Sequence, residues 1–101
     1  MKIRYTRSAQ QDLRDLLHYG LAHWPGTAVA FVTQLRARLE STLTQHPRAG
    51  RKGREKGTRE FVLAGTRHIV VYLPPSESNP DVIVVRVLHG AQQWPEQTEE
   101  A

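Results

Sequence analysis

The segment VIVVRVLHG, residues 82–90, constrains the fold of this chain most strongly. It opens with β-branched side chains, which favours a strand that is covered on both faces. Side chains alternate along a strand, so one face is predicted to carry Ile83, Val85, Val87 and His89, and the other Val82, Val84, Arg86 and Leu88. Arg86 and His89 interrupt the apolar run. Each therefore needs either a structural partner or a role in binding or catalysis.

Two amphipathic helices are predicted before this strand. Behind an N-cap at Ser8, apolar residues recur at helical spacing to about Ala22, and a second apolar stripe runs from a cap at Thr27 to about His46. The Trp-Pro-Gly sequence at 24–26 breaks the chain between them. A break this short predicts an antiparallel helical hairpin, and its apolar stripes need a second layer to cover them.

Strands supply that layer. They are predicted at Lys2–Thr6, Thr58–Ala64, Arg67–Leu73 and Asp81–His89, and the Gly-rich basic segment Arg48–Gly57 is predicted to be a loop. The predicted fold class is α+β in the order β-α-α-β-β-β, with the helical hairpin packed on a small, curled, mainly antiparallel sheet. We expect a single domain over residues 1–94 and a disordered acidic tail over residues 95–101.

Composition limits the classes of function. The 101 residues include no Cys and no His-x-x-His motif, so no metal site and no disulfide are predicted, and no cofactor is expected. No apolar stretch suits a membrane span or a signal peptide, which predicts a cytoplasmic protein without a membrane partner. The net charge of +4 is concentrated between residues 48 and 59, a segment with six Lys or Arg residues and one acidic residue. This local charge favours an anionic or acidic partner.

Several short motifs, in order, resemble the RelE/ParE superfamily of toxins from bacterial type II toxin–antitoxin modules. The likeness covers nearly the whole chain to Trp94, and its motifs are Arg4-Tyr-Thr-Arg-Ser-Ala, Gln45-His-Pro-Arg-Ala-Gly-Arg51, Gly57-Thr-Arg-Glu-Phe61, Val71-Tyr72 and Arg86-Val-Leu-His-Gly-Ala91. The resemblance implies a small toxin that halts growth and is neutralised by a cognate acidic antitoxin. It also implies one of two targets: DNA gyrase for ParE-like members, or mRNA on the ribosome for RelE-like members, which are endoribonucleases.

Two sets of candidate site residues follow. If the chain cleaves RNA, the resemblance and the chemistry of general acid–base catalysis point to His89. Arg59, Arg67 or His68 and the cluster Arg51–Lys56 would then surround the phosphate. A binding surface for the target, for nucleic acid or for the antitoxin is predicted at Arg48, Arg51, Lys52, Arg54, Lys56 and Arg86.

The residues at the end of the strand favour a toxin that binds its target over one that cleaves RNA. Gly90-Ala91 follows His89, where RNA-cleaving relatives usually carry an aromatic residue, and this ending resembles ParE-like sequences. We expect His89 to lie level with the basic loop. Arg86 also has a structural interpretation, in which its guanidinium pairs with a carboxylate such as Glu60 or Asp81.

Overall fold

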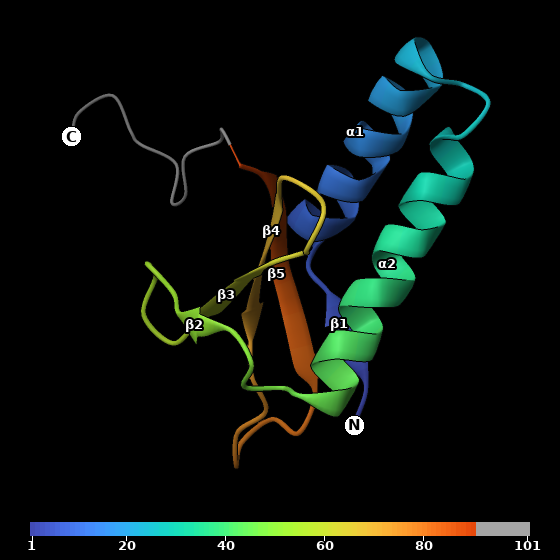
Figure 1. Cartoon of the computed structure of the whole chain (residues 1–101). Helices are drawn as coiled ribbons and strands as arrows, with labels where there is room; N and C mark the ends of the chain where they lie inside the picture. Colours follow the sequence, from blue (N-terminus) through green and yellow to red (C-terminus); the bar gives the residue numbers. More distant parts are fainter. Residues whose placement is uncertain (91–101) are drawn as a thin grey trace.

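Two helices lie on one side of a five-stranded sheet in the structure, a computed structural model that describes residues 1–90 (Figure 1). The elements are β1 (Ile3–Tyr5), α1 (Arg7–His23), α2 (Ala28–Gln45), β2 (Arg51–Lys52), β3 (Arg59–Val62), β4 (His68–Leu73) and β5 (Val82–His89). The predicted α+β architecture is confirmed. The acidic tail predicted for residues 95–101 lies outside the described residues. Neither helix of residues 1–90 combines the length and apolarity that crossing a membrane requires.

The sheet has the order β1-β5-β4-β3-β2. The strands from β2 to β5 pair antiparallel, as the predicted meander requires, and β1 extends the sheet by pairing parallel to β5. The prediction that Arg48–Gly57 is entirely loop is wrong, because Arg51 and Lys52 pair with Glu60 and Arg59 as the short edge strand β2. Two residues carry no readable period, so this strand is formed by pairing with β3 rather than by its own sequence.

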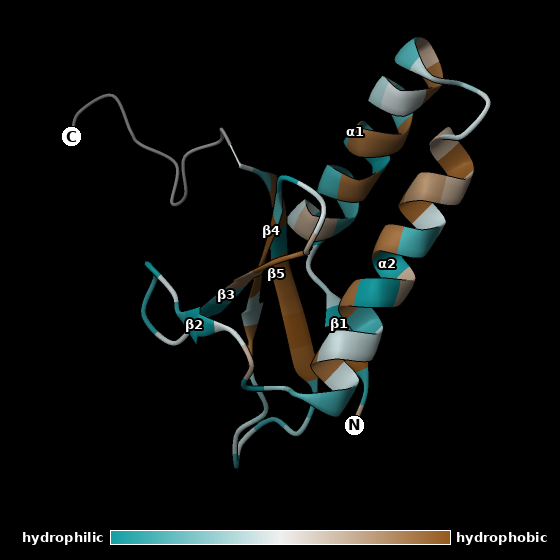
Figure 2. Cartoon of the chain, in the orientation of Figure 1, coloured by the Kyte–Doolittle hydropathy of each residue, from teal (hydrophilic) through white to brown (hydrophobic). Residues whose placement is uncertain are grey.

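The hydrophobic core lies between the helical hairpin and the face of the sheet that it covers. Of the predicted apolar stripe of α2, Ala28, Leu35, Leu39 and Leu43 are buried, while Phe31 and Val32 are half-buried. The three leucines pack with residues of α1 and the sheet. The hydrophobic colour of β5 follows most of the strand (Figure 2). The buried members of this core include Leu35, Leu39 and Leu43 from α2, Val70 and Tyr72 from β4, and Val82 and Val84 from β5. Each such side chain contributes roughly 1.5–3 kcal/mol relative to leaving it exposed, so this layer is the main source of stability.

The junction between β1 and α1 differs from the prediction. Thr6, not Ser8, caps α1: its Oγ1 accepts a hydrogen bond from the Ala9 N–H at 3.0 Å. The same hydroxyl donates to the carbonyl of Val85 at 2.7 Å, and the Thr6 N–H donates to the carbonyl of Val84 at 3.0 Å. One residue therefore caps the helix and binds the edge of β5, which fixes the start of α1 against the sheet.

A β-bulge changes the predicted faces of β5. Tyr72 pairs with Val84 and Val71 pairs with Arg86, which leaves Val85 without a partner on β4. The alternation therefore shifts by one residue, and Val87 joins Val82 and Val84 in the core, although strict alternation placed it on the opposite face. The β-branched run does not indicate this shift, since a bulge changes the pairing and not the propensity.

Gly50 leads into β2 at a point where the backbone passes close to β3. Its N–H donates to the buried hydroxyl of Tyr72 at 3.0 Å, and a Cβ at this position would lie 2.8 Å from the carbonyl oxygen of Glu60.

We therefore expect Gly50→Ala to lower the free energy of unfolding by about 1–3 kcal/mol, because the backbone atoms it meets cannot move without disturbing the β2–β3 pairing. Urea unfolding followed by circular dichroism measures the change. Gly26→Ala is the matched control, since no atom lies within 4 Å of its added Cβ. Equal destabilisation by both substitutions would contradict the close approach at Gly50.

Candidate functional site

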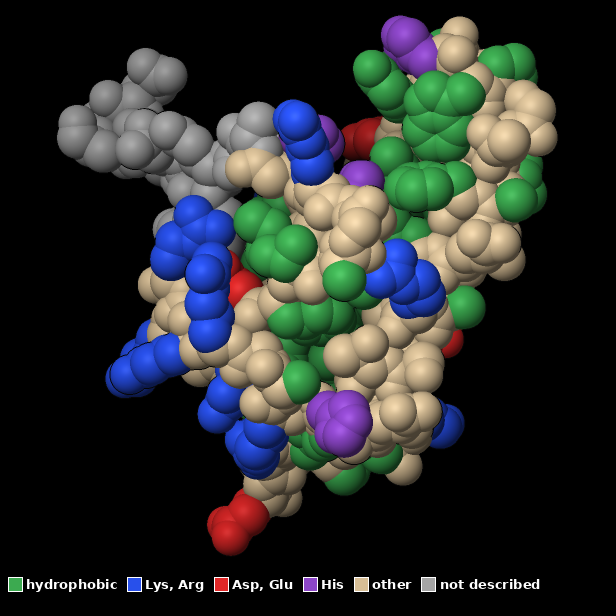
Figure 3. All heavy atoms as spheres, in the orientation of Figure 1, with side chains coloured by type: hydrophobic (Ala, Val, Ile, Leu, Met, Phe, Trp, Pro, Cys, Tyr) green, Lys and Arg blue, Asp and Glu red, His purple; other side chains and the backbone are tan. Residues whose placement is uncertain are grey.

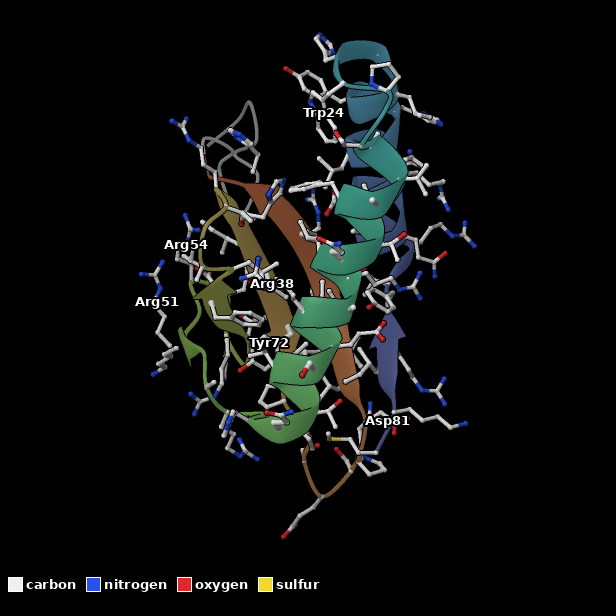
Figure 4. All side chains as sticks on the ribbon, turned by 45° about the vertical axis from the view of Figure 1, so that its right-hand side comes forward. Trp24, Arg38, Arg51, Arg54, Tyr72 and Asp81 are labelled. Atoms are coloured by element: carbon white, nitrogen blue, oxygen red, sulfur yellow. The ribbon has the colours of Figure 1, made fainter. Side chains whose placement is uncertain are left out.

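Most of the predicted binding cations gather on one part of the surface, over the β2–β3 hairpin (Figure 3). We call this segment, residues 48–59, the basic hairpin. Its cations are Arg48, Arg51, Lys52, Arg54, Lys56 and Arg59. Arg51 and Arg54 project from it on the side away from α2 (Figure 4). The structure thus brings this predicted set together.

Glu60 lies beneath the basic hairpin and organises it. Its side chain is 1% exposed, and it accepts hydrogen bonds from the backbone N–H of Arg54 at 3.1 Å and from the Arg54 guanidinium at 3.3 Å. Arg51 forms a second ion pair with it at 3.5 Å. Burial raises the pKa of Glu60, but the bonds from Arg54 and Arg51 outweigh burial and hold its pKa below the usual range.

Two further arginines of the basic hairpin bind backbone carbonyls. Arg59 donates to the carbonyls of Gly50 at 2.7 Å and Arg48 at 3.3 Å, and the Arg48 guanidinium donates to the carbonyl of Pro75 at 2.8 Å. Within residues 1–90, by contrast, the side chains of Lys52 and Lys56 make no hydrogen bond or ion pair and are exposed. The arginines therefore shape this surface, while the two lysines present charge that forms no ion pair with an acid of residues 1–90.

Arg86 lies away from the basic hairpin. Its Nε and Nη2 donate to the two carboxylate oxygens of Asp12 at 2.7 and 2.9 Å, and the side chains of this pair are 15% and 11% exposed. Pairing with a carboxylate was expected, but the partners Glu60 and Asp81 were wrong: Glu60 binds Arg54 and Arg51, and Asp81 binds Arg4 at 2.8 Å. Asp12 is on α1, which packs along the edge of β5 beyond the end of β1.

The two histidines of the predicted catalytic set meet at the other end of the sheet. His68 begins β4 and pairs in register with His89 at the end of β5, and their rings are 5.9 Å apart between centroids, edge to face. Burial, and then the neighbouring His89, lower the pKa of His68. Its Nδ1 is buried without a hydrogen-bond partner among the described residues. The neutral form of His68 is therefore favoured near pH 7.

These histidines line a pocket of about 530 Å³ between the helical hairpin and the ends of β4 and β5. We call it the histidine pocket; its lining residues are Asp12, Asp15, Leu16, Tyr19, Trp24, Phe31, His68, Val87 and His89. The aromatic lining is continuous, since Phe31 contacts Trp24 at 5.3 Å and His68 at 6.1 Å between ring centroids. This pocket was not predicted from the sequence, although Asp12, Asp15, Leu16 and Tyr19 recur on one face of α1 at helical spacing.

The structure divides the residues predicted for RNA cleavage between two places. Arg67 directly precedes His68 in the chain and is exposed. Arg59 pairs with Tyr72, four residues along β4 from His68, which corresponds to about 13 Å at the rise of a strand. The expectation that His89 lies level with the basic hairpin is thus wrong. Because β5 runs antiparallel to β4, His89 lies opposite His68, at the end of β4 away from Tyr72 and Arg59.

Comparisons with known proteins agree on one family. Residues 3–94 match the family model described as "ParE toxin of type II toxin-antitoxin system, parDE". The chain belongs to this toxin family. It is also 34% identical over 95 residues to a Sinorhizobium fredii (strain NBRC 101917 / NGR234) protein described as "Putative toxin Y4kP", a match that covers 94% of each chain. The family assignment therefore rests on almost the whole chain.

Solved structures of ParE and RelE systems share the fold of this ParE-family toxin. A chain of the chromosomal ParDE toxin–antitoxin system from P. aeruginosa superposes with a TM-score of 0.77 at 20% identity, covering 88% of this chain and 95% of that one. A chain of the intact E. coli RelBE toxin–antitoxin complex gives a TM-score of 0.59 at 20% identity, covering 91% and 98%. Fold alone thus relates this toxin to both branches of the superfamily.

The role of Glu60 leads to a test of how the basic hairpin is held. We expect Glu60→Gln to lower the free energy of unfolding at pH 7 by about 2 kcal/mol, because it removes the charge that two guanidinium groups bind. The folded-state pKa of Glu60 lies below its unfolded value, so this stabilisation is present above about pH 4.3 and is lost as pH falls through the folded-state pKa.

Urea unfolding at a series of pH values measures both effects, and the two proteins should converge in acid. Glu55→Gln, an exposed acid of the same segment, is the control and should change stability by no more than about 0.5 kcal/mol. A difference between Glu60→Gln and the native chain that stays constant down to pH 2 would contradict the assigned role.

Proposed function

We propose that this toxin arrests growth by binding an essential protein target in the cytoplasm, DNA gyrase, without cleaving RNA, and that a cognate antitoxin neutralises it. The observation that carries the proposal is the separation of the basic hairpin from the histidine pair. Metal-independent RNA cleavage needs a base, an acid and a cation around one phosphate. Here Arg59 binds backbone carbonyls, and its partner on β4, Tyr72, is about 13 Å along that strand from His68.

The basic hairpin fits a binding role. Its arginines are held by Glu60 and by backbone carbonyls, so its shape is fixed before any partner arrives. The exposed Lys52 and Lys56 add positive charge at its surface, which favours fast association with an acidic patch on a protein. No aromatic residue lies between residues 48 and 59 to stack a base, which supports a protein partner over sequence-specific RNA.

Gyrase is the target that the ParE resemblance implies, and the ParE family model supports this choice over the ribosome. The antitoxin follows from the same relatives, since the P. aeruginosa and E. coli chains of similar fold come from ParDE and RelBE toxin–antitoxin systems. The net charge of +4 supports an antitoxin that is acidic overall.

A second candidate function, ribosome-dependent mRNA cleavage, is favoured by one local observation. His68 and His89 lie edge to face, and the exposed Arg67 directly precedes His68 in the chain, so two imidazoles and one cationic residue belong to the same end of the sheet. A neutral imidazole is suited to act as a general base. This arrangement lacks the cations of the basic hairpin.

The test of the proposal is the double variant Lys52→Glu, Lys56→Glu. It should keep the unfolding midpoint of the native toxin and inhibit gyrase supercoiling roughly tenfold less. The reason is that it reverses two surface charges that make no hydrogen bond or ion pair within the described part of the chain. Lys2→Glu, Arg7→Glu is the matched control: it makes the same change of net charge on exposed residues outside the basic hairpin and should inhibit as the native toxin does.

Two outcomes would overturn the gyrase proposal. One is native toxin that arrests growth while leaving supercoiling unchanged. The other is codon-phased mRNA 5′ ends after induction that disappear in His89→Ala, which would establish the ribonuclease instead.

A further inference from the structure

The histidine pocket differs in charge from the rest of this basic toxin. Its lining includes the carboxylates of Asp12 and Asp15, and neither Lys nor Arg is among its described lining residues. Arg86 neutralises Asp12 through two hydrogen bonds. Asp15 is exposed. From the described residues, its side chain accepts one hydrogen bond, from the amide of Gln11 at 2.7 Å. Among the described residues, no ion pair balances Asp15, so this pocket presents a carboxylate within a chain of net charge +4.

The walls of the pocket are apolar and aromatic. Leu16 and Val87 supply aliphatic surface. The ring of Trp24 meets Phe31 edge to face, and Phe31 meets His68 in a tilted arrangement. Aromatic rings beside a carboxylate attract a cation through the ring quadrupole as well as through charge. A volume of about 530 Å³ lies in the range of ligand pockets, so a long side chain fits within it.

One buried polar atom of the pocket lining also lacks a hydrogen bond. The Nδ1 of His68 is buried and has no hydrogen-bond partner among the described residues, whereas buried polar atoms in folded proteins nearly always have one. The lowered pKa of His68 keeps positive charge off this ring near pH 7. The His68 ring thus does not repel a cation.

We propose that the histidine pocket receives a lysine or arginine side chain of the antitoxin, with its aliphatic stem against the apolar walls and its charge balanced by Asp15. The identity of the partner as an antitoxin rests on the proposed function; the chemistry of the occupant rests on the pocket itself. An antitoxin that is acidic overall and carries one basic residue at this point is fixed in register, because the same residue placed against the basic hairpin is repelled.

The pocket can be tested without knowing the antitoxin. The probes are Nα-acetyl-arginine amide, Nα-acetyl-norleucine amide, which has an apolar stem without charge, and Nα-acetyl-glutamate amide. Titrated into the ¹⁵N-labelled toxin at pH 7, the arginine probe should shift the amide resonances of residues 12–19, 68 and 87–89 with a Kd on the order of millimolar, equivalent to roughly 4 kcal/mol. The norleucine probe should bind at least about fivefold more weakly, and the glutamate probe should leave these resonances unchanged.

Asp15→Asn should weaken the arginine probe about threefold or more while leaving the unfolding midpoint unchanged, because Asp15 is exposed. Glu77→Gln, an exposed acid outside the pocket, is the matched control and should bind as the native toxin does. Equal binding of the arginine and norleucine probes, equal binding by Asp15→Asn and the native toxin, or no shift at these residues would each overturn the proposal.

A charge swap tests the partner. In the co-expressed pair, Asp15→Lys should weaken antitoxin binding by about tenfold, and changing one basic residue of the antitoxin to Asp should restore it. If the antitoxin binds but no basic residue restores binding, the pocket inference fails and the proposed function stands. If the protein encoded beside the toxin neither binds nor neutralises it, the proposed antitoxin fails, and the arginine titration still decides the chemistry of the pocket.

Discussion

The contact of Asp12 with β5 is the interaction on which the arrangement of the two layers depends. β1 covers the edge of β5 only from Val82 to Val84, and beyond it the edge is bound by α1 and its cap. Thr6 binds the carbonyls of Val84 and Val85, and Asp12 accepts both the Val87 N–H at 2.9 Å and the Arg86 guanidinium. The helix thus takes the place of a strand, and the charge of Asp12 is balanced as it is buried.

This anchor also determines where the candidate sites lie. With α1 fixed along β5, the face of α1 that carries Asp15 and Tyr19 lies over the ends of β4 and β5 and closes the histidine pocket. The basic hairpin forms at the other edge of the sheet, where β2 and β3 are held by Glu60. An acidic pocket and a basic surface on one small domain give a partner two features of opposite charge to recognise, which favours a single binding register.

The sequence predicted the features that depend on local pattern. The apolar stripes of both helices and the order of the strands follow from periodicity and turn residues. Pairing over long distances did not follow: Asp12 and Arg86 are separated by 74 positions, and any of several acids satisfied the rule that a half-buried guanidinium needs a partner. The bulge at Val85 also could not be predicted from the sequence. Because of it, the side chains of Val87 and His89 lie on the helix-covered face of the sheet. Which cations of the basic hairpin are structural likewise depended on the burial of Glu60, a consequence of sheet register.

The most direct test of this account is a double-mutant cycle on the anchor, with Asp12→Asn, Arg86→Gln and the two combined, each unfolded in urea. We expect a coupling free energy of about 2 kcal/mol, because the pair is largely buried and Asp12 also accepts the Val87 N–H. The same cycle on Arg4 and Asp81, a pair whose arginine is 62% exposed, should give no more than about 1 kcal/mol. Additive effects of Asp12→Asn and Arg86→Gln, within about 0.5 kcal/mol, would contradict the claim that this pair joins α1 to the sheet.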